Sequence, residues 1–206
     1  DGAGNIYIGK QAGYTIGDGG YNVAIGEEAM KSTGTAANNH ATYNVAIGNQ
    51  AGYNLTTGDN NVFLGSRAGY ASTTTQGNVA IGYEAGRYIV TSAGQTAVGY
   101  QAMKSMVDGH SNTAFGYQAL TSEVASDEST AIGYQALTNQ SGSTTTLGNT
   151  AVGHLAGRDT TTAYRNTYVG KSAALSVTTG QQNTAIGWTA LQSVTNGQGN
   201  TAVGAM

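Results

Sequence analysis

A glycine that recurs at a nearly constant spacing constrains the fold of this chain more than any other feature. Nine of the eleven steps between successive copies are 17 residues long, and the other two are longer by five and three residues. A fixed period with two local insertions predicts one elongated repeat domain over residues 1–206, with loops within 31–43 and 138–148. The repeat glycines are Gly9, Gly26, Gly48, Gly65, Gly82, Gly99, Gly116, Gly133, Gly153, Gly170, Gly187 and Gly204.

Aligning the copies on this glycine, as position zero, gives columns that predict the local structure. Position minus one is always a large apolar residue, minus two is Ala in nine of twelve copies, and plus three is Ala in all eleven that reach it. Alternation before the glycine predicts a short strand, and a second short apolar segment follows the glycine. Seventeen residues hold neither a βαβ unit nor a helix pair, but they fit two short strands and two turns.

The period therefore predicts an all-β fold, a parallel β-roll or β-solenoid of about twelve 17-residue coils stacked at about 4.8 Å. We expect the large residues at minus one and plus four to supply the apolar interior. The small Ala faces at minus two or plus three are expected to pack between copies of the chain. The glycine marks a corner where a Cβ would clash or φ is positive, so Gly116→Val should cost about 1 to 3 kcal/mol.

Asn at minus four occurs in ten copies, with Gln95 and Ser129 in the other two. This column predicts a turn residue whose amide also bonds along its own ladder. The insertion within 31–43 is rich in small residues and is expected to form a loop that tolerates a five-residue deletion. The last copy stops two residues after Gly204, which is typical of a segment of a longer protein or of an end covered by another chain.

Composition excludes several classes of partner. Charged residues make up 9% of the chain, the net charge is -3, and the eight Lys and Arg residues are scattered singly. No basic stripe follows from this pattern, so we expect no nucleic-acid partner. The chain has no Cys and no apolar run of about 18 residues, so neither disulfides nor membrane insertion are expected.

The copies also resemble a known family. Asn-Val-Ala-Ile-Gly occurs at 22–26, 44–48 and 78–82, and Asn-Thr-Ala-Val-Gly or Asn-Thr-Ala-Ile-Gly at 149–153, 183–187 and 200–204. These motifs resemble the head repeats of YadA-type trimeric autotransporter adhesins and of related bacteriophage tail fibres. The period here is longer than in the adhesin heads, and no neck, stalk or anchor follows. The departure favours a fibre segment over a complete adhesin.

The resemblance implies a left-handed β-roll and a homotrimer. It further implies a structural and adhesive fibre module that attaches to a host or cell surface through a glycan or protein receptor. The expected location is extracellular, on a cell surface or on a virion. A self-assembling extracellular filament subunit is an alternative.

Signs of catalysis are weak. His40, His110 and His154 occupy different phases of the repeat, so they form no ladder or regular metal site and are interpreted as surface residues. Residues 132–137 match the hexapeptide of left-handed β-helix acyltransferases, but each coil holds one such hexad where that fold needs about three. We expect no enzymatic activity, no catalytic or metal-binding residues and no cofactor.

An ice-binding β-solenoid is a further alternative, motivated by a column of threonines at minus three. Earlier copies carry Ile or Val at this position, so the column is interpreted as inward-facing or interfacial rather than as a water-ordering surface. The threonines are Thr96, Thr113, Thr130, Thr150, Thr167, Thr184 and Thr201.

Aromatic residues at plus one give the candidate surface-binding site. Tyr83, Tyr100, Tyr117 and Tyr134 share this phase in four consecutive coils, and Trp188 shares it three coils later. Stacked coils would place the four phenol rings in a row at about 4.8 Å. Charged and polar residues fill the same column elsewhere, so the column is expected to face outward. Such a row suits the apolar faces of sugars or a protein receptor, and the alternative is that the rings simply stack and cover the corner glycines.

Overall fold

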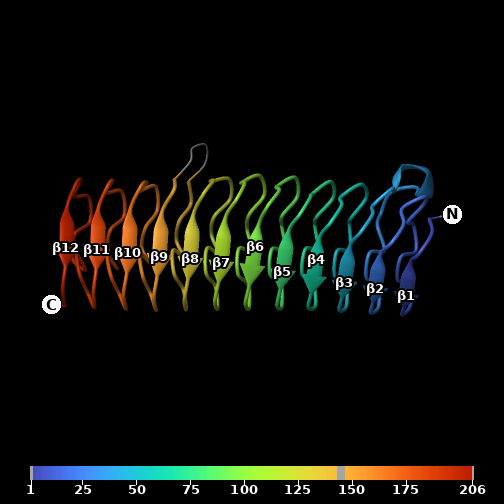
Figure 1. Cartoon of the computed structure of the whole chain (residues 1–206), viewed down its shortest axis with the longest axis horizontal. Helices are drawn as coiled ribbons and strands as arrows, with labels where there is room; N and C mark the ends of the chain where they lie inside the picture. Colours follow the sequence, from blue (N-terminus) through green and yellow to red (C-terminus); the bar gives the residue numbers. More distant parts are fainter. Residues whose placement is uncertain (1, 143–146, 206) are drawn as a thin grey trace.

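The computed structural model describes residues 2–142 and 147–205, and these form a parallel β-solenoid (Figure 1). The described strands belong to one twelve-stranded sheet whose strand order is the chain order. The elements are β1 (Ile6–Ile8), β2 (Val23–Ile25), η1 (Ala36–Asn38), β3 (Val45–Ile47), β4 (Val62–Leu64), β5 (Val79–Ile81), β6 (Thr96–Val98), β7 (Thr113–Phe115), β8 (Thr130–Ile132), β9 (Thr150–Val152), β10 (Thr167–Val169), β11 (Thr184–Ile186) and β12 (Thr201–Val203).

Residues of the same sequence column pair with each other across neighbouring strands. Thr113 pairs with Thr130, Ala114 with Ala131 and Phe115 with Ile132, and the other neighbouring strands pair in the same way. The register continues across both insertions, where Val23 pairs with Val45 and Thr130 with Thr150. The predicted parallel β-solenoid of 17-residue coils is therefore confirmed.

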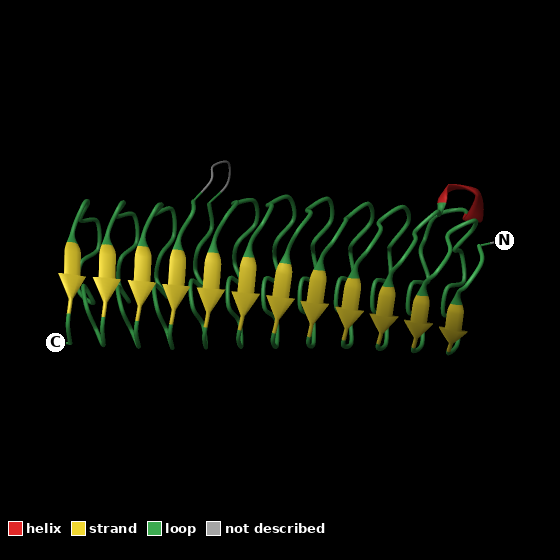
Figure 2. Ribbon diagram, viewed as in Figure 1, coloured by secondary structure: helices red, strands yellow, loops and turns green. Residues whose placement is uncertain are grey.

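Each coil holds one strand, so the prediction of two strands per coil was wrong. The second apolar segment, after the glycine, forms turns (Figure 2). Gln118 and Leu120, at plus two and plus four, have φ of 51° and 50°, and the equivalent residues of the other coils are also left-handed. Two left-handed residues within three positions prevent the segment from extending into a strand.

The prediction of which strand residues are buried was also wrong. The middle residue of each strand points inward, so Ala24, Ala114 and Ala131 are fully buried, whereas the large residues at minus one face outward. The Ala column at plus three is buried within the same chain and is not available to another copy. Because the coil is thin, small Ala side chains face each other across it, and larger residues at plus four and plus seven fill the remaining space. These larger core residues include Met30, Leu55, Ile89, Met103, Met106, Leu120, Leu137 and Val177.

Large residues enter the minus-two column only where a glycine makes room. Phe63 is fully buried, and a Cβ built on Gly69 would lie 2.5 Å from its ring. Tyr168 is also buried, and a Cβ on Gly157 would lie 2.6 Å from it. Since a packed interior leaves no spare volume, each ring and its glycine form a matched pair.

The corner role of the repeat glycines is confirmed. Their φ angles lie between 129° and 144°, a range that L side chains rarely adopt. A Cβ on Gly116 would also press against the carbonyl oxygen of Gly133 in the next coil. Both predicted reasons for glycine apply at this position.

The Asn column forms the predicted ladder. In a typical step, the backbone N–H of Asn61 donates to Oδ1 of Asn44 at 2.9 Å, and Nδ2 of Asn61 donates to the carbonyl of Thr75 at 2.9 Å. Gln95 continues the ladder, because its Oε1 accepts from the backbone N–H of Asn112 at 3.1 Å. The ladder is buried, so these amides stabilise the coil interior rather than a ligand site.

The insertion within 31–43 is more than a free loop. Asn39 is buried, and its Nδ2 donates to the carbonyl of Thr15 at 2.7 Å and to Oγ of Ser32 at 2.8 Å. A tolerated deletion is therefore limited to the exposed part of the loop, which precedes Asn39. In the insertion within 138–148, residues 143–146 lie outside the described residues. Gln140 there donates to Oγ of Ser129 at 2.9 Å and accepts from Nδ2 of Asn149 at 2.9 Å, so it bridges the Asn ladder at Ser129.

Candidate functional surfaces

The aromatic residues at plus one form a continuous outward stack, as predicted. Ring centroids are 5.4 Å apart for Tyr83 and Tyr100, 5.0 Å for Tyr100 and Tyr117, and 5.1 Å for Tyr117 and Tyr134. His154 extends the stack at 5.1 Å from Tyr134, and the interplanar angles are all 17° or less. We call these five residues the aromatic ladder.

The ladder presents ring edges rather than ring faces. Each inner ring is covered on both faces by its neighbours, so a sugar cannot stack on Tyr100, Tyr117 or Tyr134 as expected for an open platform. These residues remain about two-fifths exposed, so what faces solvent is a row of ring edges. Trp188 is exposed too, but Lys171 occupies the column between it and His154, and the ladder ends at His154 within the described chain.

A second surface consists of the outward side chains of the twelve strands, at minus three and minus one. We call it the strand face. Phe115 is 55% exposed on it, and Ile132 and Ile186 are each 39% exposed. The strand face carries no charged side chain from β1 to β12. It is therefore an unusually apolar strip for the outside of a chain.

The threonine column lies on this strand face. Thr113, Thr130 and Thr167 are half-buried and lie on the same side of their strands as the outward residues at minus one. The interpretation that the column points into the coil was therefore wrong, because the inward position of each strand is minus two.

A cluster of basic residues surrounds one buried carboxylate. Nη1 of Arg87 lies 2.6 Å from Oε1 of Glu84, Nζ of Lys104 lies 2.8 Å from Oε2, and Nη1 of Arg67 lies 3.8 Å from Oε1. The Glu84 side chain is only 4% exposed. Burial alone would raise the pKa of the Glu84 carboxyl. Hydrogen bonds from Lys104 and Gln101 and the charge of Arg87 outweigh burial and lower that pKa below its ordinary value.

Ladders of stacked side chains extend from this basic cluster in both directions along the rod. Gln101, Gln118 and Gln135 form a ladder on one side, with amide hydrogen bonds of 3.1 Å between Gln118 and Gln101 and 3.0 Å between Gln135 and Gln118. On the other side, the stacked rings of Tyr53 and Tyr70 are 5.0 Å apart. Lys31 lies over the outer face of the Tyr53 ring and Arg87 over that of the Tyr70 ring, at 5.5 and 5.6 Å.

Two further features give no candidate chemistry. His40 and His110 are exposed, as predicted, and no group of three or more His, Asp or Glu side chains in the described chain is arranged to hold a metal. No helix in the described residues has the length and apolarity needed to cross a membrane.

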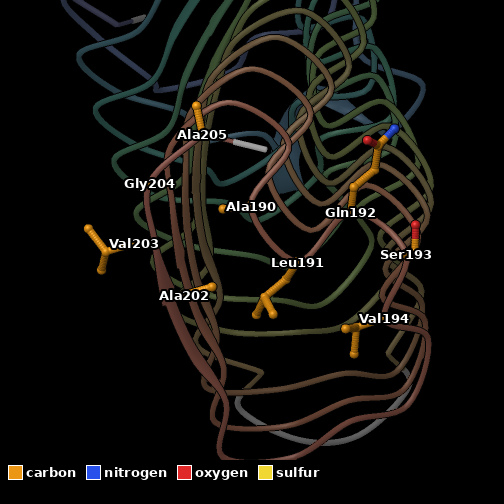
Figure 3. Close-up of a pocket in the computed structure, with 9 residues that line it drawn as sticks. All are labelled: Ala190, Leu191, Gln192, Ser193, Val194, Ala202, Val203, Gly204 and Ala205. Atoms are coloured by element: carbon orange, nitrogen blue, oxygen red, sulfur yellow. The ribbon is translucent and has the colours of Figure 1, made fainter.

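The last coil contains an open hollow of about 350 Å³ (Figure 3). Leu191, Val194 and Ala202 line it from inward positions, whereas Val203 points away. Residues in these columns are covered by the following coil elsewhere in the solenoid. The hollow is therefore the open end of the core and not a shaped ligand pocket.

Comparisons with known proteins return no match. No protein-family model matches the sequence. No curated protein and no solved structure is significantly similar to the chain. Function is therefore inferred from the surfaces of the solenoid itself.

Sequence reasoning identified the aromatic ladder but missed the basic cluster and the role of His154. The columns did contain a signal for the cluster. Arg67 and Glu84 share the plus-two column, and Arg87 and Lys104 share the plus-five column on successive coils. Stacking alone brings such residues together, so reading charges by column rather than along the chain would have found the cluster.

Proposed function

We propose that the chain is a non-enzymatic module of an extracellular fibre, a left-handed β-roll whose strand faces pack together in a homotrimer. The strand face carries this proposal, because it places a large apolar residue of every coil on the outside of the chain. Burial of these residues requires a partner surface. The alanines at minus two and plus three, predicted to form the interface, fill the interior of the coil instead.

The size of the strand face suits a stable interface. Eleven steps of about 4.8 Å give a length of about 50 Å, and a three-residue strand is about 10 Å wide. The strand face therefore has a flat area of about 500 Å², and side chains that project from it add to this area. Each partner in a standard interface buries about 800 Å². Without charged side chains, the strip meets a copy of itself without electrostatic repulsion.

A threefold arrangement suits a strip on one side of a rod. Three parallel rods can each turn one strip toward a common axis, which buries all three strips and closes the assembly. The similarity of the Asn-Val-Ala-Ile-Gly and Asn-Thr-Ala-Val-Gly motifs to trimeric adhesin and tail-fibre repeats supports the same stoichiometry. Other outward columns, including the aromatic ladder, would remain available for attachment.

Light scattering after size-exclusion chromatography tests the assembly. We expect a trimer at micromolar concentration, and a shift to monomer in the Phe115→Ser/Ile132→Ser variant. Val107→Ser/Val124→Ser is the matched control, because it removes two exposed apolar residues that lie outside the strands. A stable wild-type monomer would refute the proposal, and open polymers would instead support the filament alternative.

Attachment through the aromatic ladder is tested separately. The Tyr100→Ala/Tyr117→Ala/Tyr134→Ala variant should bind a panel of intact bacterial cells and immobilised surface glycans and proteins more weakly than the wild type. Its trimer and melting curve should be retained. Unchanged binding across a panel that the wild type recognises would reject the ladder as the attachment surface.

One observation favours ice binding as a second candidate function. The threonine column faces outward in β6 to β12, at the regular strand spacing of a parallel sheet. The same face cannot order water and be buried in a trimer. A monomer that shows thermal hysteresis would favour ice binding, and a trimer without thermal hysteresis would exclude it.

A further inference from the structure

The basic cluster has more positive charge than its carboxylate can neutralise. Arg67, Arg87 and Lys104 all pair with Glu84, and no other acidic side chain pairs with these cations in the described chain. Three of the eight Lys and Arg residues thus gather in one place on a chain whose net charge is -3. The local balance of three cations and one anion leaves two positive charges.

These charges are accessible, whereas the carboxylate is not. The side chains of Arg67, Arg87 and Lys104 are 41%, 22% and 26% exposed, above a Glu84 side chain that is 4% exposed. The carboxylate therefore holds the three cations in fixed positions from below. Nε of Arg87 is buried and Nε of Arg67 donates to Gln50, but the exposed N–H groups of the three side chains can donate hydrogen bonds to an anion at the surface.

We infer that the basic cluster is a binding site for an acidic polysaccharide, recognised through its carboxylate or sulfate groups. The inference extends the proposed attachment function by naming a ligand class. The cations come from three successive coils, so they are spread over about 10 Å along the rod. Their charged ends converge on Glu84, but that carboxylate already occupies the common point, so a ligand contacts the cations from outside, and a charged chain lying along the rod can reach all three.

The neighbouring surface favours a glycan over a nucleic acid. Gln101, Gln118 and Gln135 continue a row of amides from the cluster, and amides suit the hydroxyl groups of sugars. Binding of single-stranded nucleic acid relies on free aromatic faces for base stacking. Here the Tyr70 ring is covered by Tyr53 on one face and by Arg87 on the other.

The repeat itself supplies conservative variants for a test. Gln is the usual residue in the Arg67 column, and Thr121 and Thr138 occupy the Lys104 column two and three coils on from Arg87. Arg67→Gln/Lys104→Thr therefore removes both surplus charges while keeping the Arg87–Glu84 pair. The control is Arg165→Gln/Lys171→Asn, which removes the same net charge elsewhere on the chain. Its substitutions also follow the repeat, because Gln182 occupies the Arg165 column and Asn49 the Lys171 column.

Binding is measured with polygalacturonate and dextran sulfate as acidic probes and with uncharged dextran. We expect the wild type and the control variant to bind the acidic probes in 50 mM salt and to lose most of this binding in 500 mM salt. Neither should bind uncharged dextran. Arg67→Gln/Lys104→Thr should bind about tenfold more weakly. If that variant does not fold, Arg67→Gln alone, at the most exposed cation, should weaken binding about threefold.

Three results would overturn the inference. The first is that the wild type binds neither acidic probe, and the second is that both double variants lose binding to the same extent. The third is that the wild type binds single-stranded DNA as tightly as it binds the acidic probes. None of them depends on oligomeric state. A trimer that ignores acidic probes would leave the fibre proposal standing, and a monomer that binds them would leave the ligand class standing.

Discussion

The two sides of each strand differ in a way that reverses the usual relation between size and burial. In β7, the small Ala114 is fully buried, and the larger Phe115 beside it is 55% exposed. The same contrast recurs along the sheet. The inward side is limited by the width of a coil that has one strand, so it accepts large rings only opposite a glycine. The outward side has no such limit, so the fold of one coil does not dictate how large or how apolar its residues are.

The largest expected effect is at the corner between the two sides. Gly116→Val places a β-branched residue at φ of 144° and presses its Cβ against the carbonyl of Gly133. Backbone strain and steric overlap together should lower the free energy of unfolding by about 4 kcal/mol. Thermal and urea denaturation measure this loss. An unchanged melting temperature would show that the corner can relax and does not separate the two sides.

The next prediction concerns the inward side. Ala114→Leu adds three carbon atoms to an interior with no matching glycine, and should cost about 3 kcal/mol. If the loss falls well below 1 kcal/mol in urea denaturation, the interior is not close-packed and the contrast between the sides is weaker than proposed.

A smaller effect is expected at the buried acid among the outward polar columns. Glu84→Gln leaves three cations without their carboxylate and should cost about 2 kcal/mol at pH 7. Because the pKa of Glu84 is lowered by folding, its stabilisation is present above the ordinary value of 4.5 and is lost as pH falls through the folded pKa. The stability difference between wild type and variant should therefore shrink in urea titrations at pH 3. A constant difference would mean that charge plays no part.

Tyr168→Phe is expected to stabilise the inward side slightly. The Tyr168 hydroxyl is buried without a well-formed hydrogen bond, and Thr160 beside it is in the same state. Burial raises the pKa of Tyr168, with a smaller opposing effect from Thr160. Phe63 shows that the column accepts a phenylalanine. Removing the hydroxyl should raise the free energy of unfolding by about 0.5 to 1 kcal/mol, and a loss of that size would indicate a real Tyr168–Thr160 hydrogen bond.

The smallest effect is expected for an exchange on the outward side. Thr113→Val replaces one outward residue with the residue that β2 to β5 carry in the same column. The change in unfolding free energy should stay within about 0.5 kcal/mol. A larger change, measured beside Ala114→Leu, would show that the outward position is as constrained as the inward one.

The sequence predicted the features that depend on period alone. Spacing gave the parallel stacking, the corner glycines, the Asn ladder and the outward row that begins at Tyr83. It did not predict which side of the strand was buried, because minus two and minus one are both apolar and period-2 alternation does not show which set points inward. The left-handed residues at plus two and plus four, such as Gln118 and Leu120, were also missed, since these residue types rarely adopt positive φ. The Glu84 cluster depends on contacts between coils, which are visible only when columns are compared.

The matched pairs of ring and glycine have a consequence for folding. A chain of near-identical coils can pair each coil with the wrong neighbour, since a slip of 17 residues preserves the Ala columns and most of the Asn ladder. Such a slip would move Phe63 away from Gly52 of the preceding coil, where a Cβ would lie 3.0 Å from its ring, and Tyr168 away from Gly157, and would set a large ring against a coil with no space for it. The irregular residues therefore act as register marks, which penalise misaligned intermediates that the repeat by itself would accept.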